Sequence, residues 1–378
     1  MTDKYWNAIF TDISFANFKI VTPQDITNIR LFSHQLMGGV FKTPKEIVAW
    51  MGAMQAQDYA MSKWAVGVRL LNSTDKMVQD SLNNGEIIRT HILRPTWHLV
   101  SADNIYWMLE LSGPRVKAFI KPRIKHLELS DELFLKGNNI IEQALRDNNH
   151  LTRDELIGGL NTQKINTDDL RGLHFLMNAE LEGIICNGIT KNKNQTYALL
   201  AERVTKPASI NKDEALAKLA KTYFQSHAPA TLADFAWWSG LSMVDAKQGL
   251  ESIRSEFVEE KIRSQLYLMN NNSVSISANT KSTYLLPAFD EFLISYKDRT
   301  AAIPLDKQSQ AFTNNDIFKP VIVENGRTSG TWKRTVKKET VIIDTEHFKP
   351  PNEVSKKRLT KAAKLYGDFL GKKVEMLR

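Results

Sequence analysis

Two glutamines placed one residue apart are the side chains whose type and spacing most suggest chemistry. Gln55 and Gln57 follow an apolar segment at residues 47–51 and stand beside Asp58 and Tyr59. Polar groups near a core must be hydrogen-bonded or must face a cleft. We therefore predict that the two amides line a pocket. The alternative is that they end a helix and bond only to backbone or water.

The composition excludes several classes of protein. The chain has 378 residues, of which 42% are hydrophobic, and a size of about 100–200 residues per domain predicts two to four compact units. No apolar run is long enough to cross a bilayer, and the first residues lack the basic and then apolar layout of a secretory signal. We therefore expect a cytoplasmic protein that makes no membrane contact.

The cysteine and histidine content gives no indication of a metal site. The single cysteine, Cys186, excludes an internal disulfide and a multi-cysteine metal site. The eight histidines are scattered along the chain and show no ligand spacing. We expect neither a metal nor another cofactor.

The charge balance favours an anionic partner. The formal net charge is +8 at pH 7, which favours nucleic acid first and acidic membrane surfaces second. A soluble basic protein without such a partner can have the same net charge, so the distribution of the basic residues along the chain is more informative than their number. The basic residues gather at residues 115–125, 333–338 and 356–358.

Residues 22–110 have the order of elements of a winged helix-turn-helix unit, three helices followed by a hairpin. Thr22 and Thr43 each precede a proline and are candidate N-caps of the first two helices. The second helix is expected to run up to the glutamines. A third helix at residues 76–82 and two strands within residues 86–100 complete the unit.

The same order recurs twice further along the chain, after an N-terminal arm that we expect to pack on the body. In residues 111–205, three helices, the second ending at Gly158, precede a hairpin at residues 184–200. In residues 210–272, three helices precede a strand pair at residues 257–269. Spaced repeats of one supersecondary unit predict a tandem array.

The last part of the chain, residues 275–378, changes to short strands. Asn325-Gly326 between two of them is a strong hairpin signal. Residues 355–370 form a basic amphipathic pattern and predict a tail helix. The expected fold class is α+β, with three tandem winged helix-turn-helix units followed by a small β-rich, barrel-like unit.

Winged helices usually place a helix on DNA and a wing against phosphate or the minor groove. Winged helices that bind other proteins also exist, so the repeats alone leave both functions open. A transcriptional regulator commonly has a single winged helix joined to a dimerisation helix. Three winged helices followed by a β-rich unit instead favour one continuous surface that encloses the DNA.

Four stretches, taken together and in order, resemble a known family. They are residues 55–58 (Gln-Ala-Gln-Asp), 93–100 (Leu-Arg-Pro-Thr-Trp-His-Leu-Val), 285–299 (beginning Leu-Leu-Pro-Ala-Phe-Asp-Glu-Phe) and 330–334 (Gly-Thr-Trp-Lys-Arg). In this order they resemble the bacterial winged helix DNA-binding proteins that include the AlkZ/YcaQ-type DNA glycosylases. The resemblance covers about residues 25–372, nearly the whole chain.

The resemblance implies a C-shaped scaffold of tandem winged helices with a β-barrel, which clasps double-stranded DNA over a central concavity. Members that are enzymes cut the N-glycosidic bond of alkylated purines, including N7-guanine adducts and interstrand crosslinks. The family's catalytic pair maps onto Gln55 and Gln57, whereas other members carry Asp or His at one of the two positions. A DNA-binding hairpin is also implied, but no motif assigns it to a stretch of this chain.

The amide pair suits a base that is already activated. A departing base leaves oxocarbenium character on the sugar, which partial negative charge stabilises. An N7-alkylated purine carries positive charge and leaves without strong acid assistance. A glutamine oxygen can hold the water and face the cation, but it is no general base at neutral pH. Asp58 or Asp290 is the candidate for a true base, with a helix cap or a structural role as the alternative for each.

Seven residues are candidates for DNA contacts. They are Arg94, Thr96, His98, Arg299, Trp332, Lys333 and Arg334. Phosphate contacts provide sequence-independent affinity with a steep salt dependence. The alternatives are solvated basic side chains, a structural strand histidine at His98, and use of residues 115–125 as the basic patch. Trp237 and Trp238 are alternatives for a wedge in the duplex, although a predicted helix favours the core for them.

We therefore predict a monomeric, monofunctional and metal-free DNA glycosylase for cationic N7-alkyl purines, associated with the nucleoid. Whether it also unhooks interstrand crosslinks stays open. One alternative is a non-catalytic winged-helix DNA-binding protein, such as a transcriptional regulator. The other is a winged-helix interaction module that binds no nucleic acid.

Overall fold

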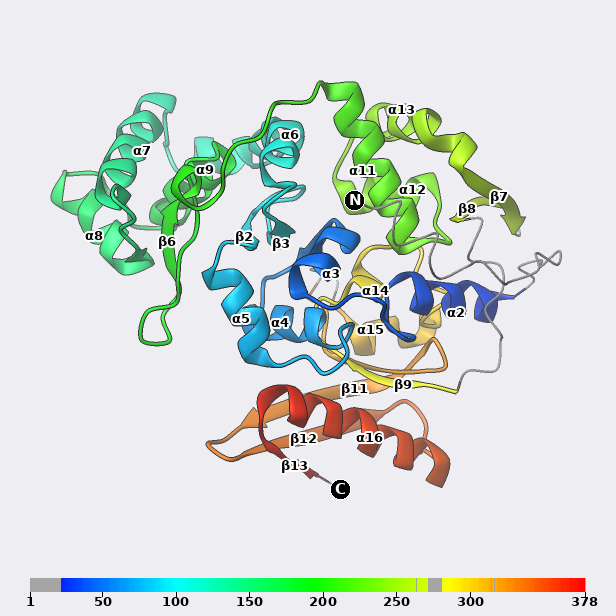
Figure 1. Cartoon of the computed structure of the whole chain (residues 1–378). Helices are drawn as coiled ribbons and strands as arrows, with labels where there is room; N and C mark the ends of the chain where they lie inside the picture. Colours follow the sequence, from blue (N-terminus) through cyan, green and yellow to red (C-terminus); the bar gives the residue numbers. More distant parts are fainter. Residues whose placement is uncertain (1–21, 263, 271–280, 314, 316, 378) are drawn as a thin grey trace.

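The computed structural model describes residues 22–262, 264–270, 281–313, 315 and 317–377 (Figure 1). The predicted N-terminal arm lies before residue 22, outside the described residues. Helix α2 (Pro23–Ser33) is the first helix of the described residues and begins, as expected, with a capping box in which Thr22 and Asp25 satisfy each other's backbone N–H groups.

The first repeat of the fold, residues 44–101, has a three-stranded sheet in the order β1-β3-β2. Its elements are α3 (Pro44–Met51), β1 (Ala53–Gln55), α4 (Tyr59–Gly67), α5 (Asp75–Asn83), β2 (Ile87–His91) and β3 (Trp97–Ser101). Thr43 caps α3 with a second capping box. The expectation that the helix continues to the glutamines is wrong, because Gly52 with φ 77° ends α3 and Gln55 belongs to a strand.

The second repeat, residues 131–199, has the same strand pattern, β4-β6-β5. Its elements are α7 (Asp131–Leu145), β4 (Leu151–Thr152), α8 (Arg153–Thr162), α9 (Arg171–Leu181), β5 (Ile185–Asn187) and β6 (Thr196–Leu199), followed by α10 (Leu200–Arg203). Helix α8 continues through Gly158, where we expected it to end, because its Thr152–Glu155 capping box and buried Leu156 and Leu160 outweigh the helix cost of glycine. The long helix α6 (Ile105–His126) precedes this repeat and spans the predicted boundary at residue 110.

The third repeat, residues 212–270, follows this order with one strand reduced to a bridge. Its elements are α11 (Lys212–His227), α12 (Leu232–Ser239), α13 (Met243–Ile253), η1 (Arg254–Glu256), β7 (Phe257–Ile262) and β8 (Gln265–Asn270). Ala230 forms an isolated antiparallel bridge with Leu268, so β8 lies between this bridge and β7.

The C-terminal part forms a five-stranded sheet in the order β13-β12-β11-β10-β9. Its elements are β9 (Thr283–Leu286), α14 (Glu291–Ile294), η3 (Leu305–Lys307), α15 (Gln308–Ala311), β10 (Val321–Glu324), β11 (Arg327–Val336), β12 (Thr340–His347), α16 (Glu353–Leu370) and β13 (Lys373–Met376). Asn325 and Gly326, with φ of 50° and 78°, form the predicted turn. Within the described residues, β13 and β9 each pair with one neighbour, so the sheet is open. The parallel strand β13 was not predicted.

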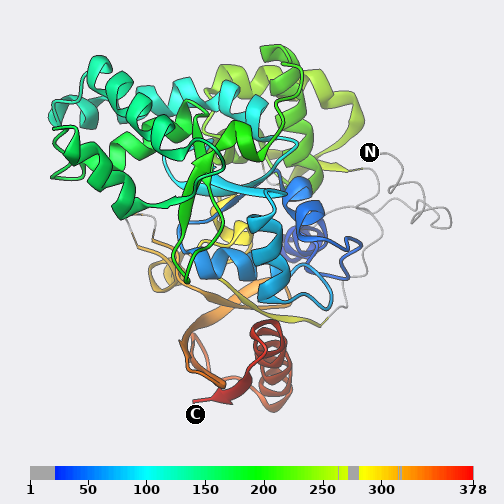
Figure 2. The ribbon, with the colours of Figure 1, turned by 60° about the vertical axis from the view of Figure 1, so that its left-hand side comes forward.

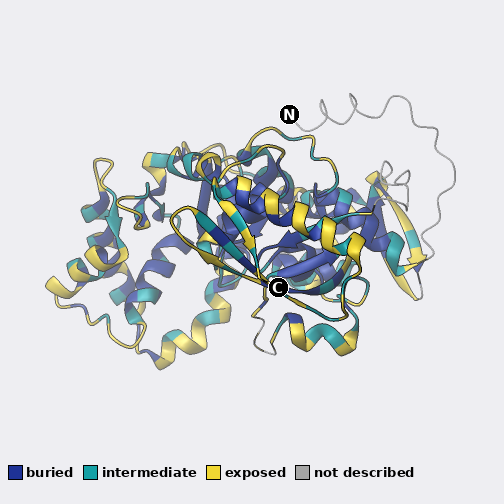
Figure 3. Ribbon diagram, turned by 90° about the horizontal axis from the view of Figure 1, so that it is seen from below, coloured by how far each residue is buried: buried dark blue, intermediate teal, exposed yellow. Residues whose placement is uncertain are grey.

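The first repeat lies at the centre of the molecule (Figures 1 and 2). One hydrophobic cluster joins its strands to the third repeat, and another joins its helices to the C-terminal sheet and α16. The indole N–H groups of Trp64 and Trp332 donate to the carbonyl oxygens of Leu285 and Leu286 at 2.7 and 2.8 Å. Figure 3 shows α16 with one face buried and the other exposed.

The second repeat has a hydrophobic cluster of its own, built from residues 127–199. Its strand β5 lies against β2 of the first repeat, where Arg89 N–H donates to the Asn187 side chain at 2.7 Å. Among the described residues, no helix is both long and apolar enough to span a membrane.

Candidate active site

Gln55 and Gln57 stand where the first repeat changes from strand to helix. Gln55 is the last residue of β1 and pairs with His98 of β3. Gln57 follows in the turn, and Asp58 then caps α4 by accepting from Met61 N–H at 3.0 Å. A short edge strand followed immediately by a capped helix fixes the backbone on both sides of the pair.

Both glutamines line one cavity of about 870 Å³. Ligand sites are typically concavities of about 300–1,000 Å³ with few polar groups on apolar walls. The walls come from five further segments: residues 93–96, α6, α12, the segment around α14, and the described part of residues 315–318. The predicted pocket at the amide pair is therefore present in the structure.

Each amide oxygen is held by a backbone N–H group. Gln55 Oε1 accepts from Gln57 N at 3.0 Å, and Gln57 Oε1 accepts from Trp97 N at 3.4 Å. A carbonyl oxygen has two lone pairs, so one bond to the backbone fixes its direction and leaves room for a second donor such as water. Gln55 is 5% exposed, whereas Gln57 is open to solvent.

Two arginines and a tryptophan also line this cavity. They are Arg94, Arg115 and Trp237. The guanidinium of Arg115 donates from Nε to the carbonyl oxygen of Gly240. The indole of Trp237 donates to Ile294 O at 2.9 Å, and the guanidinium of Arg299 lies 5.2 Å from its ring centroid. The cavity thus combines cationic groups with an aromatic wall.

The segment between β2 and β3 presents Arg94 and Thr96 to the cavity through tight turns. Arg94 N–H donates to Ile92 O, and Thr96 N–H donates to Arg94 O, both at 2.7 Å. Leu93 has φ 60°, a conformation that costs a non-glycine residue about 1–3 kcal/mol and persists only when its surroundings hold it. The Ser112 hydroxyl, which accepts from Leu93 N–H at 3.1 Å, is part of that support.

The two predicted carboxylate bases are engaged elsewhere. Asp58 caps α4 and lies 3.8 Å from Arg334 Nη2, and its side chain is 41% exposed. Asp290 is buried and accepts from both Nη atoms of Arg69 at 2.8 and 2.9 Å. Neither belongs to the lining of the cavity. These contacts agree with the alternatives considered for the two residues, a helix cap for Asp58 and a structural role for Asp290.

Two of the predicted DNA contacts are buried, which corrects the expectation for them. His98 is 1% exposed and donates through Nδ1 to Thr96 O at 2.9 Å, and burial together with the charge of Arg94 lowers its pKa to about 3. Trp332 is 1% exposed within the cluster beneath α16. A strand side chain that faces a core is closed to DNA, and the sequence motif alone does not show which face is buried.

The other predicted contacts are spread over two regions. Arg94 and Thr96 line the cavity, and Arg299 lies behind it, over the rings of Trp237, Phe312 and Phe318. Lys333 is exposed on β11, and the side chain of Arg334 is 16% exposed beside Asp58. The structure therefore brings together the amide pair, Arg94 and Thr96, and not the β11 residues.

Sequence reasoning missed several residues at the cavity. Phe119 of α6 lines it and is 72% exposed, and Arg115 lies one helical turn earlier on the same face. The basic run at residues 115–125 was the available signal. Of the tryptophan pair, Trp238 is buried and Trp237 lines the cavity. Glu291 accepts a hydrogen bond from the Gln55 backbone N–H. Apart from its place in a family motif, nothing in the sequence indicated this contact.

In the part of the chain that the structure describes, no group of three or more His, Cys, Asp or Glu side chains could hold a metal ion.

Repeated helix–hairpin units in a basic chain, around a cavity lined by two amides and two arginines, favour a class of protein that binds nucleic acid. Comparison with known protein families identifies the family of this chain. Residues 48–369 match the family described as DNA glycosylase AlkZ-like, and the chain belongs to this family. The resemblance inferred from the motifs is thereby confirmed, and DNA repair and DNA binding follow from it.

The fold is similar to that of a solved structure. The DNA glycosylase AlkZ of Streptomyces sahachiroi superposes with a TM-score of 0.78 at 18% sequence identity, over 94% of this chain and 100% of that chain. No curated protein sequence matches the chain.

Proposed function

We propose that this protein is a monofunctional DNA glycosylase that removes cationic N7-alkyl purines from double-stranded DNA by hydrolysis. The observation that carries the proposal is the placing of Gln55 and Gln57 together on the wall of one large cavity beside Arg94. Membership of a DNA glycosylase family supports the reaction class. The substrate and the roles of the residues are our inference from the chemistry of the site.

In this proposal, the two amides hold the attacking water and stabilise the sugar. The oxygens of Gln55 and Gln57 keep one lone pair each for a water molecule or for the positive charge that develops at the sugar carbon. The described residues that line the cavity include no carboxylate and no histidine, so in this proposal the reaction depends on a leaving group that is already weakly bonded. A purine alkylated at N7 meets this requirement, and an undamaged base does not.

The DNA interface that we propose includes Arg94, Thr96 and Arg115 at the cavity and Lys333 on β11. The first three line the cavity, and Lys333 is exposed. Their contacts with phosphate supply affinity that does not depend on sequence, which suits a search for rare lesions. His98 and Trp332 are left out because both are buried.

Monofunctional chemistry is supported by the lining of the cavity. A glycosylase that also cuts the strand uses an amine as the nucleophile to form a Schiff base. The described residues that line this cavity include Arg94 and Arg115 as cations and no lysine. We therefore propose that water attacks the sugar directly and that the phosphodiester backbone stays intact.

We also propose that the three repeats are winged helices and that the chain acts as a monomer. The order of helix, strand or bridge, two helices and hairpin supports the first point, with the last strand central in each sheet. The units predicted at residues 22–110, 111–205 and 210–272 each contain one repeat, and residues 275–378 contain the C-terminal sheet, but a boundary at residue 110 would divide helix α6. The first repeat shares one hydrophobic cluster with the third repeat and another with the C-terminal sheet and α16. One chain can therefore form a complete site, which supports the monomer.

The test is release of free base from duplex DNA that carries 7-methylguanine. Wild-type protein is expected to release the base and leave an alkali-labile but uncut strand. The double variant Gln55→Ala and Gln57→Ala should bind the same duplex and release at least 100-fold less base, a loss of about 3 kcal/mol of transition-state stabilisation. A duplex with an interstrand N7-guanine crosslink, run in parallel, tests whether crosslinks are substrates.

A non-catalytic DNA-binding protein is the alternative outcome of this assay. If both proteins bind DNA and neither releases base from either duplex, the proposal of catalysis is wrong. If neither protein binds DNA at low salt, both DNA functions fail.

A further inference from the structure

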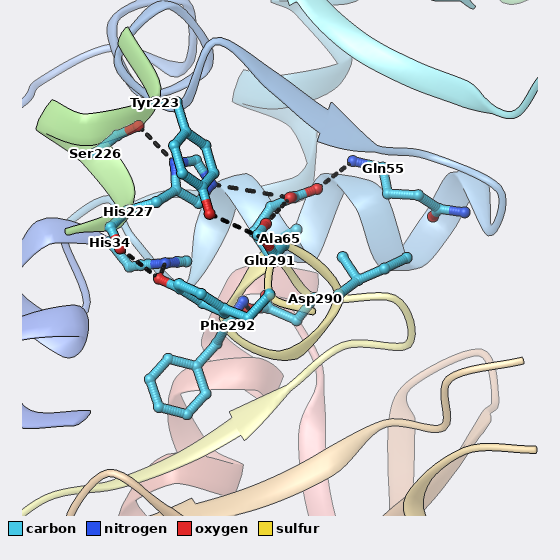
Figure 4. Close-up of polar contacts among 12 residues, drawn as sticks. His34, Gln55, Ala65, Tyr223, Ser226, His227, Asp290, Glu291 and Phe292 are labelled. Atoms are coloured by element: carbon cyan, nitrogen blue, oxygen red, sulfur yellow. Dashed lines mark hydrogen bonds and ion pairs between the residues drawn. The ribbon is translucent and has the colours of Figure 1, made fainter. Parts of the chain in front are cut away.

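A buried carboxylate that the proposed reaction does not use lies directly behind Gln55. Glu291 is 1% exposed, and its Oε1 accepts the backbone N–H of Gln55 at 2.6 Å. Figure 4 shows the two residues joined in this way, with the side-chain amide of Gln55 directed away from the carboxylate. The acid is therefore in contact with the backbone of a proposed catalytic residue and not with the substrate space.

The strand geometry explains why this contact is needed. Ala56 N–H donates to Trp97 O across the β1–β3 pair at 2.7 Å. Since alternate residues of a strand direct their N–H groups to opposite sides, the N–H of Gln55 points away from β3. Strand β1 is at the edge of its sheet, so no neighbouring strand accepts that N–H. Glu291 supplies the acceptor that a fourth strand would otherwise provide.

The carboxylate itself is firmly held. The preceding residue, Asp290, caps α14 by accepting from Phe292 N–H at 2.9 Å and is fixed by Arg69. The hydroxyl of Ser295 donates to Glu291 Oε2, and His227 Nε2 lies 3.9 Å from the same oxygen. A buried acceptor that receives a second hydrogen bond, here from Ser295, holds its own position and that of its donor.

The position of Glu291 relative to the cavity makes this contact relevant to the reaction. Gln55, Arg94 and Ile294 all line the cavity, and Ile294 belongs to the same short helix as Glu291. Loss of the bond would free the end of β1, and the amide that it carries would move relative to the sugar. A displacement of about 1 Å at a reacting group can cost about 100-fold in rate.

We propose that Glu291 is a positioning residue that sets the direction of the Gln55 amide in the cavity. This inference rests on the proposed glycosylase function. It differs from a purely structural role because its effect on the rate must pass through the side chain of Gln55.

The experiment measures single-turnover release of 7-methylguanine, DNA affinity and thermal stability for the full chain. Glu291→Met removes the acceptor while approximately keeping the volume, and release is expected to slow by about 10- to 100-fold with DNA affinity changed less than about twofold. Glu291→Gln keeps an acceptor oxygen for Gln55 N–H and is expected to stay within about fivefold of wild type. Equal slowing by both variants would contradict the inference, because the charge and not the bond would then matter.

A double-mutant cycle separates positioning from general damage. In the background Gln55→Ala the N–H remains but there is no amide to orient, so Glu291→Met should cause little further slowing. Additive losses in the two backgrounds would show that Glu291 acts elsewhere and would overturn the inference. If wild-type protein releases base and Glu291→Met releases it equally fast, the inference alone fails; if wild type releases none, the proposed function fails first.

A milder variant covers the case in which Glu291→Met does not fold. Ser295→Ala removes the hydroxyl that donates to Glu291 Oε2 and keeps Glu291 itself as the acceptor for the Gln55 N–H. It is expected to slow release several-fold, again with no further effect in the Gln55→Ala background. A folded Ser295→Ala protein with unchanged release and unchanged melting temperature would contradict the proposed chain of contacts.

Discussion

At the scale of single residues, the proposed active site relies on neutral amides in a place where many hydrolases have a carboxylate. Gln55 and Gln57 are oriented by backbone N–H groups. Two described carboxylates adjacent to them are engaged elsewhere, Asp58 as a helix cap and Glu291 as the acceptor of the Gln55 backbone N–H. Such a site has little power to deprotonate water. Its selectivity must therefore come from the leaving group, which explains why we expect activity only on cationic bases.

The buried His98 predicts an acid-sensitive fold. Its pKa is lowered to about 3 from an ordinary value of 6.5, first by burial and second by the charge of Arg94. Between these two pH values the unfolded chain binds a proton that the folded chain does not, so the free energy of unfolding falls as the pH is lowered from 6.5 toward 3. His98→Asn keeps a donor for Thr96 O but does not titrate. Urea unfolding of this variant should show a shallower loss of stability over that range, and an unchanged slope would contradict the assignment.

At the scale of elements, the wall of the cavity depends on a close backbone approach between α12 and the segment after β2. Gly240 ends α12 with φ 68°, and a Cβ there would lie 2.5 Å from the carbonyl oxygen of Leu93. That carbonyl belongs to backbone and cannot move aside without shifting Arg94. The packing of α12 on this segment therefore positions cavity residues from two repeats.

Gly240→Ala is expected to destabilise the protein by about 2–4 kcal/mol and to slow base release, because strain at positive φ is added to a backbone clash. Gly371→Ala is the matched control: its φ is 65°, and no atom lies within 4 Å of the added Cβ. This control should lose only about 1–2 kcal/mol and keep its activity. Thermal unfolding and base release measure both effects, and equal losses would show that the close approach does not matter.

The exposed face of α6 provides a second prediction for an element. Phe119 is 72% exposed at the cavity, one turn from Arg115. If this ring stacks on a base of the bound DNA, Phe119→Ala should weaken binding to lesion-containing duplex by about 1–3 kcal/mol, and Phe119→Trp should restore it. Leu135→Ala, at a 63% exposed apolar residue of α7, is the control. Fluorescence anisotropy measures the affinities, and equal effects at Phe119 and Leu135 would exclude stacking.

At the scale of the whole molecule, three separate parts of the chain must be packed together to make one site. The first repeat shares one hydrophobic cluster with the third repeat and another with the C-terminal sheet and α16. The cavity is lined by residues of the first repeat, α6, the third repeat and the segment around α14. No isolated repeat contains the site.

The net charge of +8 predicts strongly salt-dependent DNA binding, to which individual basic residues contribute unequally. Lys333 is exposed on β11, and Lys333→Ala should reduce the slope of log affinity against log salt by about one. Lys364 on the outer face of α16 pairs with Asp368 at 2.7 Å, and Lys364→Ala should leave the slope unchanged. A slope that changes equally in both variants would mean that the interface is not on the β11 side.

The sequence by itself determined the local elements and the family. Thr22, Thr43, Thr152 and Thr231 cap helices because a short hydroxyl side chain satisfies nearby N–H groups without tertiary help. Asn325-Gly326 forms its turn for an equally local reason, its positive φ values. The ordered motifs identified the family and placed Gln55 and Gln57 at a pocket.

Only the tertiary structure decided which polar and aromatic side chains face the cavity and which face a core. Trp332 and His98 carry the residue types of a DNA contact but are buried, while Phe119 and Trp237 line the cavity from helices whose sequence did not show which side chains face it. The bond from Gln55 to Glu291 joins residues 236 positions apart. Such contacts depend on how distant segments pack together, and this packing is a property of the whole chain that no local spacing of residues encodes.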